Sequence, residues 1–230
     1  MSELDLSLGL LAALVACGAA LGLDAASWPQ VMISRPIVAA TFGGALLGDA
    51  ASGFLVGAVL ELLGLGHTPY GAAVYPETGP AGLLAGAGLA ASGGTDIGPL
   101  LVAVASGWAI GWIGAISVRM QRRLNERLLA GGGLAAPAKR LERRHRLAMV
   151  LDALRAGTLT AAFALPVMLL VKLADGVSMI EGVVAASALL LVGMGLAGGV
   201  GVGVMRRRAT DPLLLLAGGA IALAMIVTGQ

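Results

Sequence analysis

The chain has 230 residues, of which 58% are hydrophobic and 12% charged, and its mean hydropathy is +0.92. Soluble domains contain roughly 45–50% apolar and about 25% charged residues, so this composition excludes an ordinary soluble domain and indicates an integral membrane protein. The net charge of +2 is unevenly spread: residues 1–118 contain one cation, Arg35, and residues 119–146 contain nine. Because these cations lie between apolar spans, they indicate a solvated loop at the inner membrane face rather than a nucleic-acid surface.

The first predicted transmembrane helix covers residues 6–23, close to the roughly 20 apolar residues that a membrane crossing needs. Acidic Glu3 and Asp5 stand where a signal peptide would carry positive charge, so we expect a retained helix. Cys17 lies in this run and is the only cysteine, which rules out a disulfide within the chain.

Two shorter apolar segments follow, at residues 36–47 and 53–65. Each covers roughly 20 Å, which is less than a hydrocarbon core of about 30 Å. The polar break between them cannot face lipid, because its backbone groups would lack hydrogen-bond partners. We therefore expect a re-entrant hairpin whose tip carries Asp49.

A second interrupted region begins at residue 66. It contains three prolines up to residue 80 and continues into a short apolar piece at residues 81–91. Short hydrophobic segments broken by Gly and Pro indicate where a transporter binds its substrate. The sequence therefore favours a binding site in the N-terminal half.

Four longer spans are predicted at residues 97–118, 156–173, 180–204 and 212–228. Between the first two, we expect a basic region with helical flanks around a glycine hinge at residues 131–133. Lys and Arg collect in cytoplasmic loops, so this region and the arginine triplet 206–208 should both be cytoplasmic, which two intervening spans allow. Gln230 is then expected outside.

These elements predict an all-α polytopic integral membrane protein with short re-entrant segments in its N-terminal half. We interpret residues 1–230 as one membrane domain. Its parts are an N-terminal half (1–118), a basic cytoplasmic loop (119–155) and C-terminal helices (156–230).

Isolated charges in apolar segments are costly to bury, so they usually line a pathway or pair internally. Glu61 is either a substrate ligand or a packing residue, protonated or paired with Arg35. Arg35 is in turn an internal counter-ion or an interfacial anchor. Asp49 either binds substrate or caps the next helix, and Glu77 has the same two alternatives. His67 borders the proposed cavity and is a further substrate-binding candidate.

Other chemistries lack support in the sequence. The two histidines, His67 and His145, are far apart and have no neighbours at metal-ligand spacing, so we expect no metal. Residues 193–198 match G-x-G-x-x-G but follow no strand, and there is no P-loop, so we expect no cofactor and no catalytic residues. Paired glycines instead indicate close helix contacts: Gly53/Gly57, Gly82/Gly86, Gly107/Gly111 and Gly199/Gly203.

Four runs in order carry a family resemblance: residues 33–38, 47–49, 57–62 and 71–77. Their motifs and spacing resemble the membrane subunit IIC of the mannose/fructose/sorbose family of the phosphoenolpyruvate-dependent sugar phosphotransferase system (PTS). The similarity is specific over residues 10–91 and less distinctive in the basic loop and residues 145–155. Residues 193–216 resemble the family's later helices.

The resemblance implies a permease component of the bacterial inner membrane that moves a hexose for phosphorylation by a IIB partner. It also implies an all-helical fold with re-entrant hairpins, a IID membrane subunit, IIA and IIB phosphocarriers, and a trimer of IIC–IID pairs. The family's Leu-Glu, Gly-Asp and Pro-Asp motifs fall on Glu61, Asp49 and Pro76-Glu77, the last with Glu in place of Asp.

Two departures from the family pattern favour alternatives. The loop is Arg-rich rather than acidic, and the chain ends at Gln230, where members usually continue. A non-transporting sensor or scaffold derived from the family would fit these differences. An ion-coupled permease that uses Glu61 or Asp49 as its proton site is a further alternative.

Overall fold

A computed structural model describes residues 7–64, 74–93, 96–130 and 137–175. This part of the chain forms six helices: α1 (Leu8–Ala26), α2 (Pro36–Leu46), α3 (Ala50–Gly64), α4 (Thr78–Ser92), α5 (Ile97–Ala130) and α6 (Ala138–Leu173). Among them α1, α5 and α6 are long and apolar enough to cross a membrane, and α2 and α3 are shorter apolar helices. The spans expected at 180–204 and 212–228, and the triplet 206–208, lie outside the described residues.

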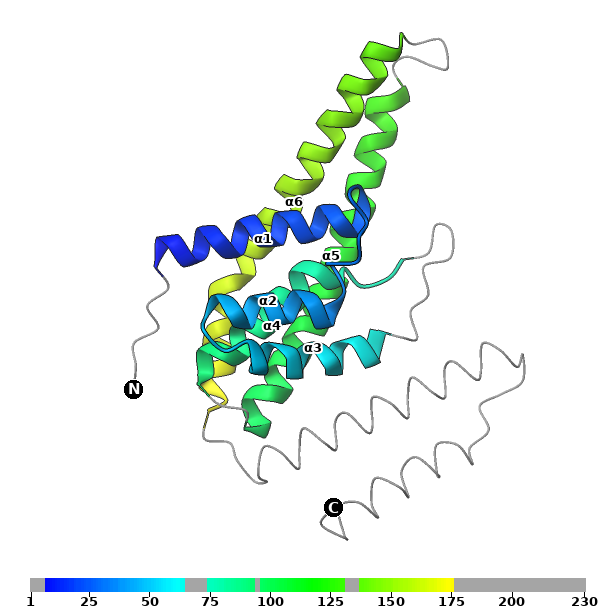
Figure 1. Ribbon diagram of the computed structural model, residues 1–230. Coiled ribbons are helices and arrows are strands. Elements are labelled where there is room, and N and C mark those ends of the chain that lie inside the picture. The colour runs from blue at the N-terminus through cyan, green and yellow to red at the C-terminus, as the bar shows by residue number, and fades with distance from the viewer. Residues whose placement is uncertain (1–6, 65–73, 94–95, 131–136, 176–230) are drawn as a thin grey trace, which may run out of the picture.

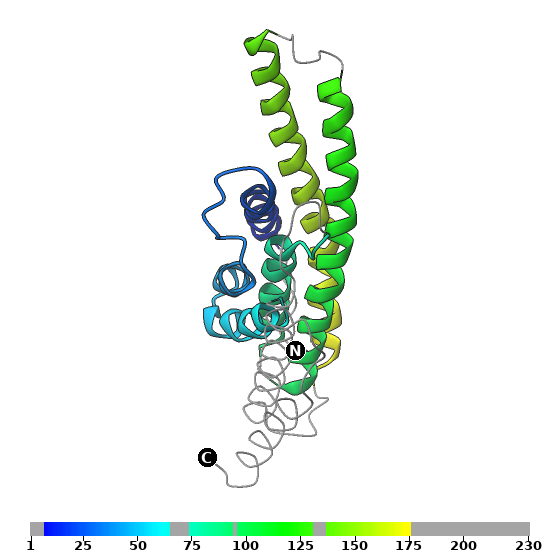
Figure 2. The same cartoon turned by 90° about the vertical axis from the view of Figure 1, so that its right-hand side faces the viewer.

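The longest elements are α5 and α6, with 34 and 36 residues. At about 1.5 Å per residue they extend about 51 and 54 Å, well beyond a hydrocarbon core of about 30 Å. They lie side by side in Figures 1 and 2, and one end of the pair reaches past all the other described helices. In Figure 1, α1, α2 and α3 run across this pair.

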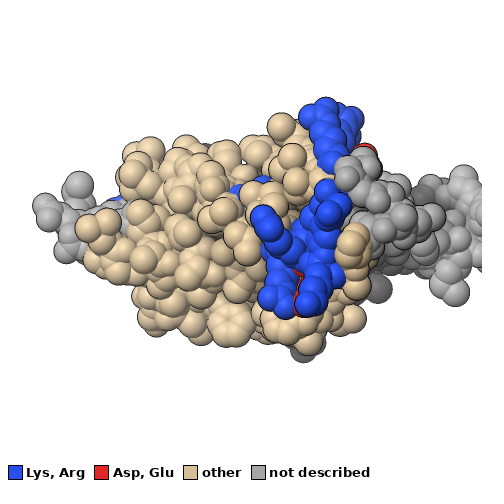
Figure 3. All heavy atoms as spheres, turned by 90° about the horizontal axis from the view of Figure 1, so that it is seen from above, with Lys and Arg blue, Asp and Glu red and all other residues tan. Residues whose placement is uncertain are grey.

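The projecting end of this pair carries the basic residues. Figure 3 looks onto it from above and shows Lys and Arg gathered there, with few acidic atoms among them. Residues 119–130 of α5 and 138–146 of α6 are called the basic arms below. The arms are the helical flanks expected for the basic region, and the glycine hinge expected at residues 131–133 lies outside the described residues.

The short segments form a helical hairpin. Gly48 has a φ of 85°, a conformation that glycine adopts without strain, and it turns the chain between α2 and α3. The hairpin packs through small residues: a Cβ added at Gly53 or Gly86 would meet the carbonyl of Ala40. Cβ atoms at Gly107 and Gly111 would likewise come within 3.0 Å of Ala85 and Pro76. These positions confirm the close helix contacts expected from the described glycine pairs, and the pair Gly199/Gly203 lies outside the described residues.

The centre of the fold is α4, although it has only 15 residues. It contacts all five other described helices, and Leu83, Leu84 and Leu89 are fully or almost fully buried. A helix that is apolar on every side must be surrounded by protein or lipid. The other described helices therefore pack around this short central helix.

Four helix ends meet beside the middle of α5 and α6. The Thr78 hydroxyl donates to the Ser34 carbonyl at 3.0 Å, which joins the starts of α4 and α2. The Glu77 amide donates to the Gly111 carbonyl of α5 at 2.8 Å. The ends of α1 and α3 reach the same level through contacts described below, and most of the buried polar residues lie there.

Candidate functional site

The most buried ion pair joins Glu77, the residue before α4, to Arg155 on α6. Arg155 Nη1 donates to Glu77 Oε2 at 2.7 Å, and Nη2 donates to Oε1 at 2.6 Å. The side chains are 10% exposed for Arg155 and 2% for Glu77. Such two-point pairing fixes orientation as well as charge, so it ties the start of α4 to the middle of α6.

Glycines make room for this pair. A Cβ at Gly114 of α5 would lie 2.6 Å from Glu77 Oε2, and one at Gly22 of α1 would lie 3.3 Å from Oε1. The Glu77 carboxylate therefore occupies a narrow slot between α1 and α5. No larger residue at Gly114 leaves the carboxylate in place.

Arg155 also organises its surroundings. Its Nε donates to Asp152 Oδ1 at 3.0 Å, and its Nη1 donates to the Ser117 hydroxyl at 2.8 Å. The Ser27 hydroxyl, just after α1, donates to Asp152 Oδ2 at 2.8 Å. One guanidinium thus pairs with two buried carboxylates. Together with Ser27 and Ser117, these residues link α1, α4, α5 and α6.

Asp24 shapes the connection that follows α1. It is buried, and its carboxylate accepts from the amides of Val31 at 2.7 Å and Ser34 at 2.9 Å. These bonds fold residues 27–34 back over the end of α1. They bring Arg35 to the start of α2, next to the end of α3.

A second ion pair joins Arg35 to Glu61 of α3. Arg35 Nε donates to Glu61 Oε1 at 2.6 Å, Nη2 contacts the same oxygen, and the Ile37 amide donates to Oε2 at 3.3 Å. The Arg35 side chain is 48% exposed and that of Glu61 15%. Unlike the Glu77–Arg155 pair, this pair is open to a ligand.

The remaining predicted residues lie elsewhere. Asp49 is at the opposite end of α2, and its carboxylate accepts from the Ser52 amide at 3.0 Å and from the Ser52 hydroxyl. These are the contacts of a helix cap. His67 lies outside the described residues. The structure therefore brings Arg35, Glu61 and Glu77 to one level and separates Asp49 from them by the length of α2.

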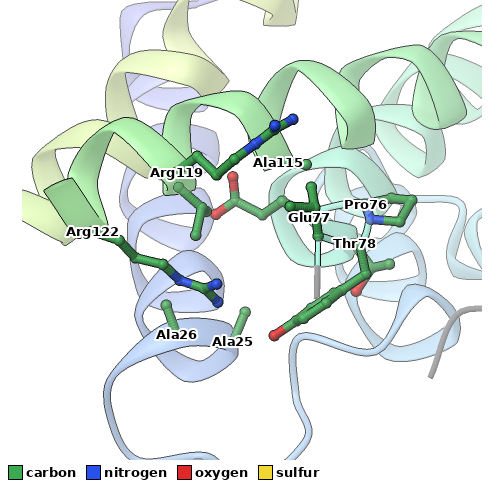
Figure 4. A pocket seen from close by; sticks show the side chains of 11 residues that line it. Ala25, Ala26, Pro76, Glu77, Thr78, Ala115, Arg119 and Arg122 are labelled. Carbon is green, nitrogen blue, oxygen red and sulfur yellow. The ribbon is translucent and has the colours of Figure 1, made fainter. Parts of the chain in front are cut away.

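A pocket of about 40 Å³ opens beside Glu77. Figure 4 shows it between the end of α1, the segment before α4, and α5, with the side chains of Glu77 and Arg122 directed toward it. A second space of about 10 Å³ lies between the starts of α2 and α4 and helix α5, and it shares Pro76 and Thr78 with the first. Neither of these two spaces is large enough for a whole hexose.

Sequence reasoning did not select Arg155, Asp152 and Asp24 as site residues. Asp24 was visible as an isolated acid within an apolar run. Asp152 and Arg155 stand three residues apart where the polar part of α6 meets its apolar part. That spacing places them on one helix face. Two charged residues on one face at the edge of an apolar run were the sequence pattern that could have indicated a buried polar site here.

No cluster of three His, Cys, Asp or Glu side chains that could hold a metal ion occurs in the described residues. Long apolar helices, a short helical hairpin and buried ion pairs where helix ends meet together define a multi-pass membrane protein with a polar interior site. A solved structure titled "Structure of membrane protein" has the same fold, with a TM-score of 0.69 and 18% identity, over 97% of this chain and 96% of that one.

The chain belongs to the family described as the PTS system sorbose-specific IIC component, whose model matches residues 6–205. It is also similar to the mannose-specific EIIC components of Escherichia coli K12 and Shigella flexneri. Each is 37% identical over 73 residues, which is 31% of this chain and 26% of the relative. The match thus spans about a quarter of those relatives. The family expected from the motifs is confirmed, and it places the chain in the bacterial plasma membrane.

Proposed function

We propose that the chain is a sugar-translocating subunit that moves a hexose across the plasma membrane for phosphorylation by a IIB partner. Its family membership over residues 6–205 carries this proposal. The expected assembly adds a IID membrane subunit and IIA and IIB phosphocarriers, as a trimer of IIC–IID pairs. The charged side chains of the two ion pairs, near the starts of α2 and α4, supply the polar contacts that a sugar needs.

In this proposal the two ion pairs have different roles. Arg35 and Glu61 contact the sugar, because their pair is accessible and a hydroxyl can accept from the guanidinium while donating to the carboxylate. Glu77 is already held by two bonds from Arg155 and positions the helices around the site. Asp49 supports the hairpin as a cap, and His67 stays a candidate ligand.

Replacing Glu61 by Gln tests the proposal. The change keeps the size of the side chain but removes its charge and turns one acceptor into a donor. Losing a charged hydrogen bond costs about 1.5–3 kcal/mol, or roughly 10- to 150-fold in sugar affinity. Titration of the reconstituted membrane complex with hexoses measures this loss.

A matched control is Glu142→Gln, the same change in an exposed pair with Arg146 on a basic arm. Sugar affinity should not change in that variant. Normal binding and transport by Glu61→Gln would remove Glu61 from the site. Loss of assembly by Glu61→Leu would show that Glu61 is structural instead.

Uptake by membrane vesicles tests the transport class. Accumulation that requires phosphoenolpyruvate and the phosphocarriers supports the proposal. Accumulation driven by a proton gradient would instead indicate an ion-coupled permease. No uptake by an intact complex would indicate a sensor or scaffold.

A further inference from the structure

Two arginines beside Glu77 have no assigned role. Arg119 and Arg122 of α5 both line this pocket and both are exposed, and in Figure 4 the Arg122 guanidinium is directed into it while the Arg119 side chain runs along α5 toward Ala115. Within the described residues neither forms an ion pair, although Glu126 follows Arg122 by one helical turn. Two unpaired guanidinium groups at the rim of one pocket attract an anion.

Glu77 also lines the pocket, but its carboxylate is not free. The Glu77 carboxylate is fully engaged by the two bonds from Arg155. The hydroxyl-bearing side chain of Tyr75 also lines the pocket and can donate to an anion. The accessible groups are therefore mainly donors.

The pocket suits a small, highly charged group. Its volume of about 40 Å³ admits a few heavy atoms and leaves a larger ligand outside. Guanidinium groups match the oxygens of a phosphate better than an ammonium does, because their donors form a rigid fork. A phosphate ester with its phosphoryl group inside and its alcohol portion outside fits these limits.

The position of the pocket suggests the rest of the ligand. Pro76 and Thr78 line both this pocket and the smaller space lined by Pro36 and Leu60, the neighbours of Arg35 and Glu61. We propose that Arg119, Arg122 and Tyr75 form a site for the phosphoryl group of a phosphorylated sugar, on the side of the proposed sugar site that faces the basic arms. This inference rests on the proposed function and extends it from the incoming sugar to its product.

The test uses the complete membrane complex in phosphatidylcholine nanodiscs, with mannose, mannose 6-phosphate and inorganic phosphate as probes in calorimetric titrations. Arg122→Gln should weaken mannose 6-phosphate binding by roughly tenfold or more, because a charged hydrogen bond is lost. Mannose affinity should not change. Arg122→Lys keeps the charge but loses the forked donors, so its affinity for mannose 6-phosphate should lie between those of the wild type and Arg122→Gln.

Arg127→Gln is the matched control, since it removes the same charge one turn beyond the pocket, on the same basic arm. It should leave mannose 6-phosphate binding unchanged. An equal loss in this variant, or no loss in Arg122→Gln, would overturn the site. Suppression of mannose 6-phosphate binding by equimolar phosphatidylglycerol in the nanodiscs would assign the arginines to lipid headgroups and would also overturn it.

The mannose arm separates the two proposals. If the wild-type complex binds mannose 6-phosphate through Arg122 but no free hexose, the proposed sugar site fails and the phosphate site stands. If mannose binding depends on Glu61 but the affinity for mannose 6-phosphate is the same in the wild type and in Arg122→Gln, the phosphate site alone fails.

Discussion

Arg155 connects several parts of the fold through one side chain. Its guanidinium contacts Glu77, Asp152 and Ser117 while its own helix contributes only one of them. A buried ion pair adds little net stability compared with well-packed apolar residues, but removing one partner strands the other charge. The value of Arg155 is therefore that it fixes helix positions, and its loss should be costly.

We predict that Arg155→Met destabilises the protein by about 3–5 kcal/mol, since two carboxylates are left buried without a cation. Arg155→Lys should also be destabilising, because a single ammonium cannot reproduce the two parallel bonds to Glu77. Thermal unfolding in detergent, followed by the fraction that remains monodisperse, measures both.

The control for this prediction is Arg146→Met, which breaks an exposed pair with Glu142. Exposed pairs contribute about 0–1 kcal/mol, so this variant should unfold near the wild-type temperature. Equal stability of Arg155→Met and Arg146→Met would contradict a central role for the buried group.

Local sequence patterns could reveal individual charges but not their partners. Glu61 and Arg35 stand out because each is isolated in an apolar segment, and their pairing was one of the alternatives considered. The bond between Glu77 and Arg155 spans 78 positions. Nothing in the spacing of either residue indicates the other, because only the packing of α4 against α6 brings them together.

At the scale of elements, backbones approach one another closely because the contacting residues are small. In α2 and α4 this contact runs through Gly43 and Gly86, where an added Cβ would meet the carbonyls of Leu83 and Ala40. Small residues allow such approaches in membranes, where association depends on packing.

We predict that Gly86→Ala destabilises the fold by more than the roughly 1–3 kcal/mol typical of overpacking, because the obstacle is backbone rather than a side chain that can rotate. Gly9→Ala is the control. Its Cβ would meet only the Ser7 hydroxyl oxygen at 3.8 Å, so it should be neutral or gain up to about 1 kcal/mol of helix propensity. A wild-type melting temperature for Gly86→Ala would show that α2 and α4 can move apart without loss of stability.

The lengths of apolar runs predicted most of the described elements, but not where the longest helices end. Hydropathy falls at Val118, yet α5 continues to Ala130 because Arg, Leu, Met and Glu are all good helix formers. The two short helices of the hairpin were predictable because the apolar runs that form α2 and α3 are each too short for a bilayer. The order in which these helices surround α4 was not, since apolar faces alone do not select neighbours.

For the whole molecule, the basic arms determine orientation. Short segments rich in Lys and Arg stay in the cytoplasm, and α5 and α6 are each about 20 Å longer than the hydrocarbon core of a bilayer. The projecting end seen in Figure 3 should therefore be cytoplasmic.

We predict that single cysteines placed at Gly132 and at Gln230, in a Cys17→Ala background, react with an impermeant maleimide from opposite sides of the membrane. The reason is the two spans expected between the basic region and the triplet 206–208, with one more before Gln230. Intact cells and inverted vesicles provide the two directions of labelling. Labelling of both positions from the same side would refute this topology.

The long separation of Glu77 and Arg155 also constrains biogenesis. A ribosome that adds about 5–20 residues per second makes Arg155 about 4–16 s after Glu77. Throughout that interval Glu77 has been made but Arg155, its ion-pair partner, has not. We therefore expect the first four helices to reach their final arrangement only after α6 has been made. We expect maturation of this protein to be a late, cooperative event rather than a helix-by-helix one.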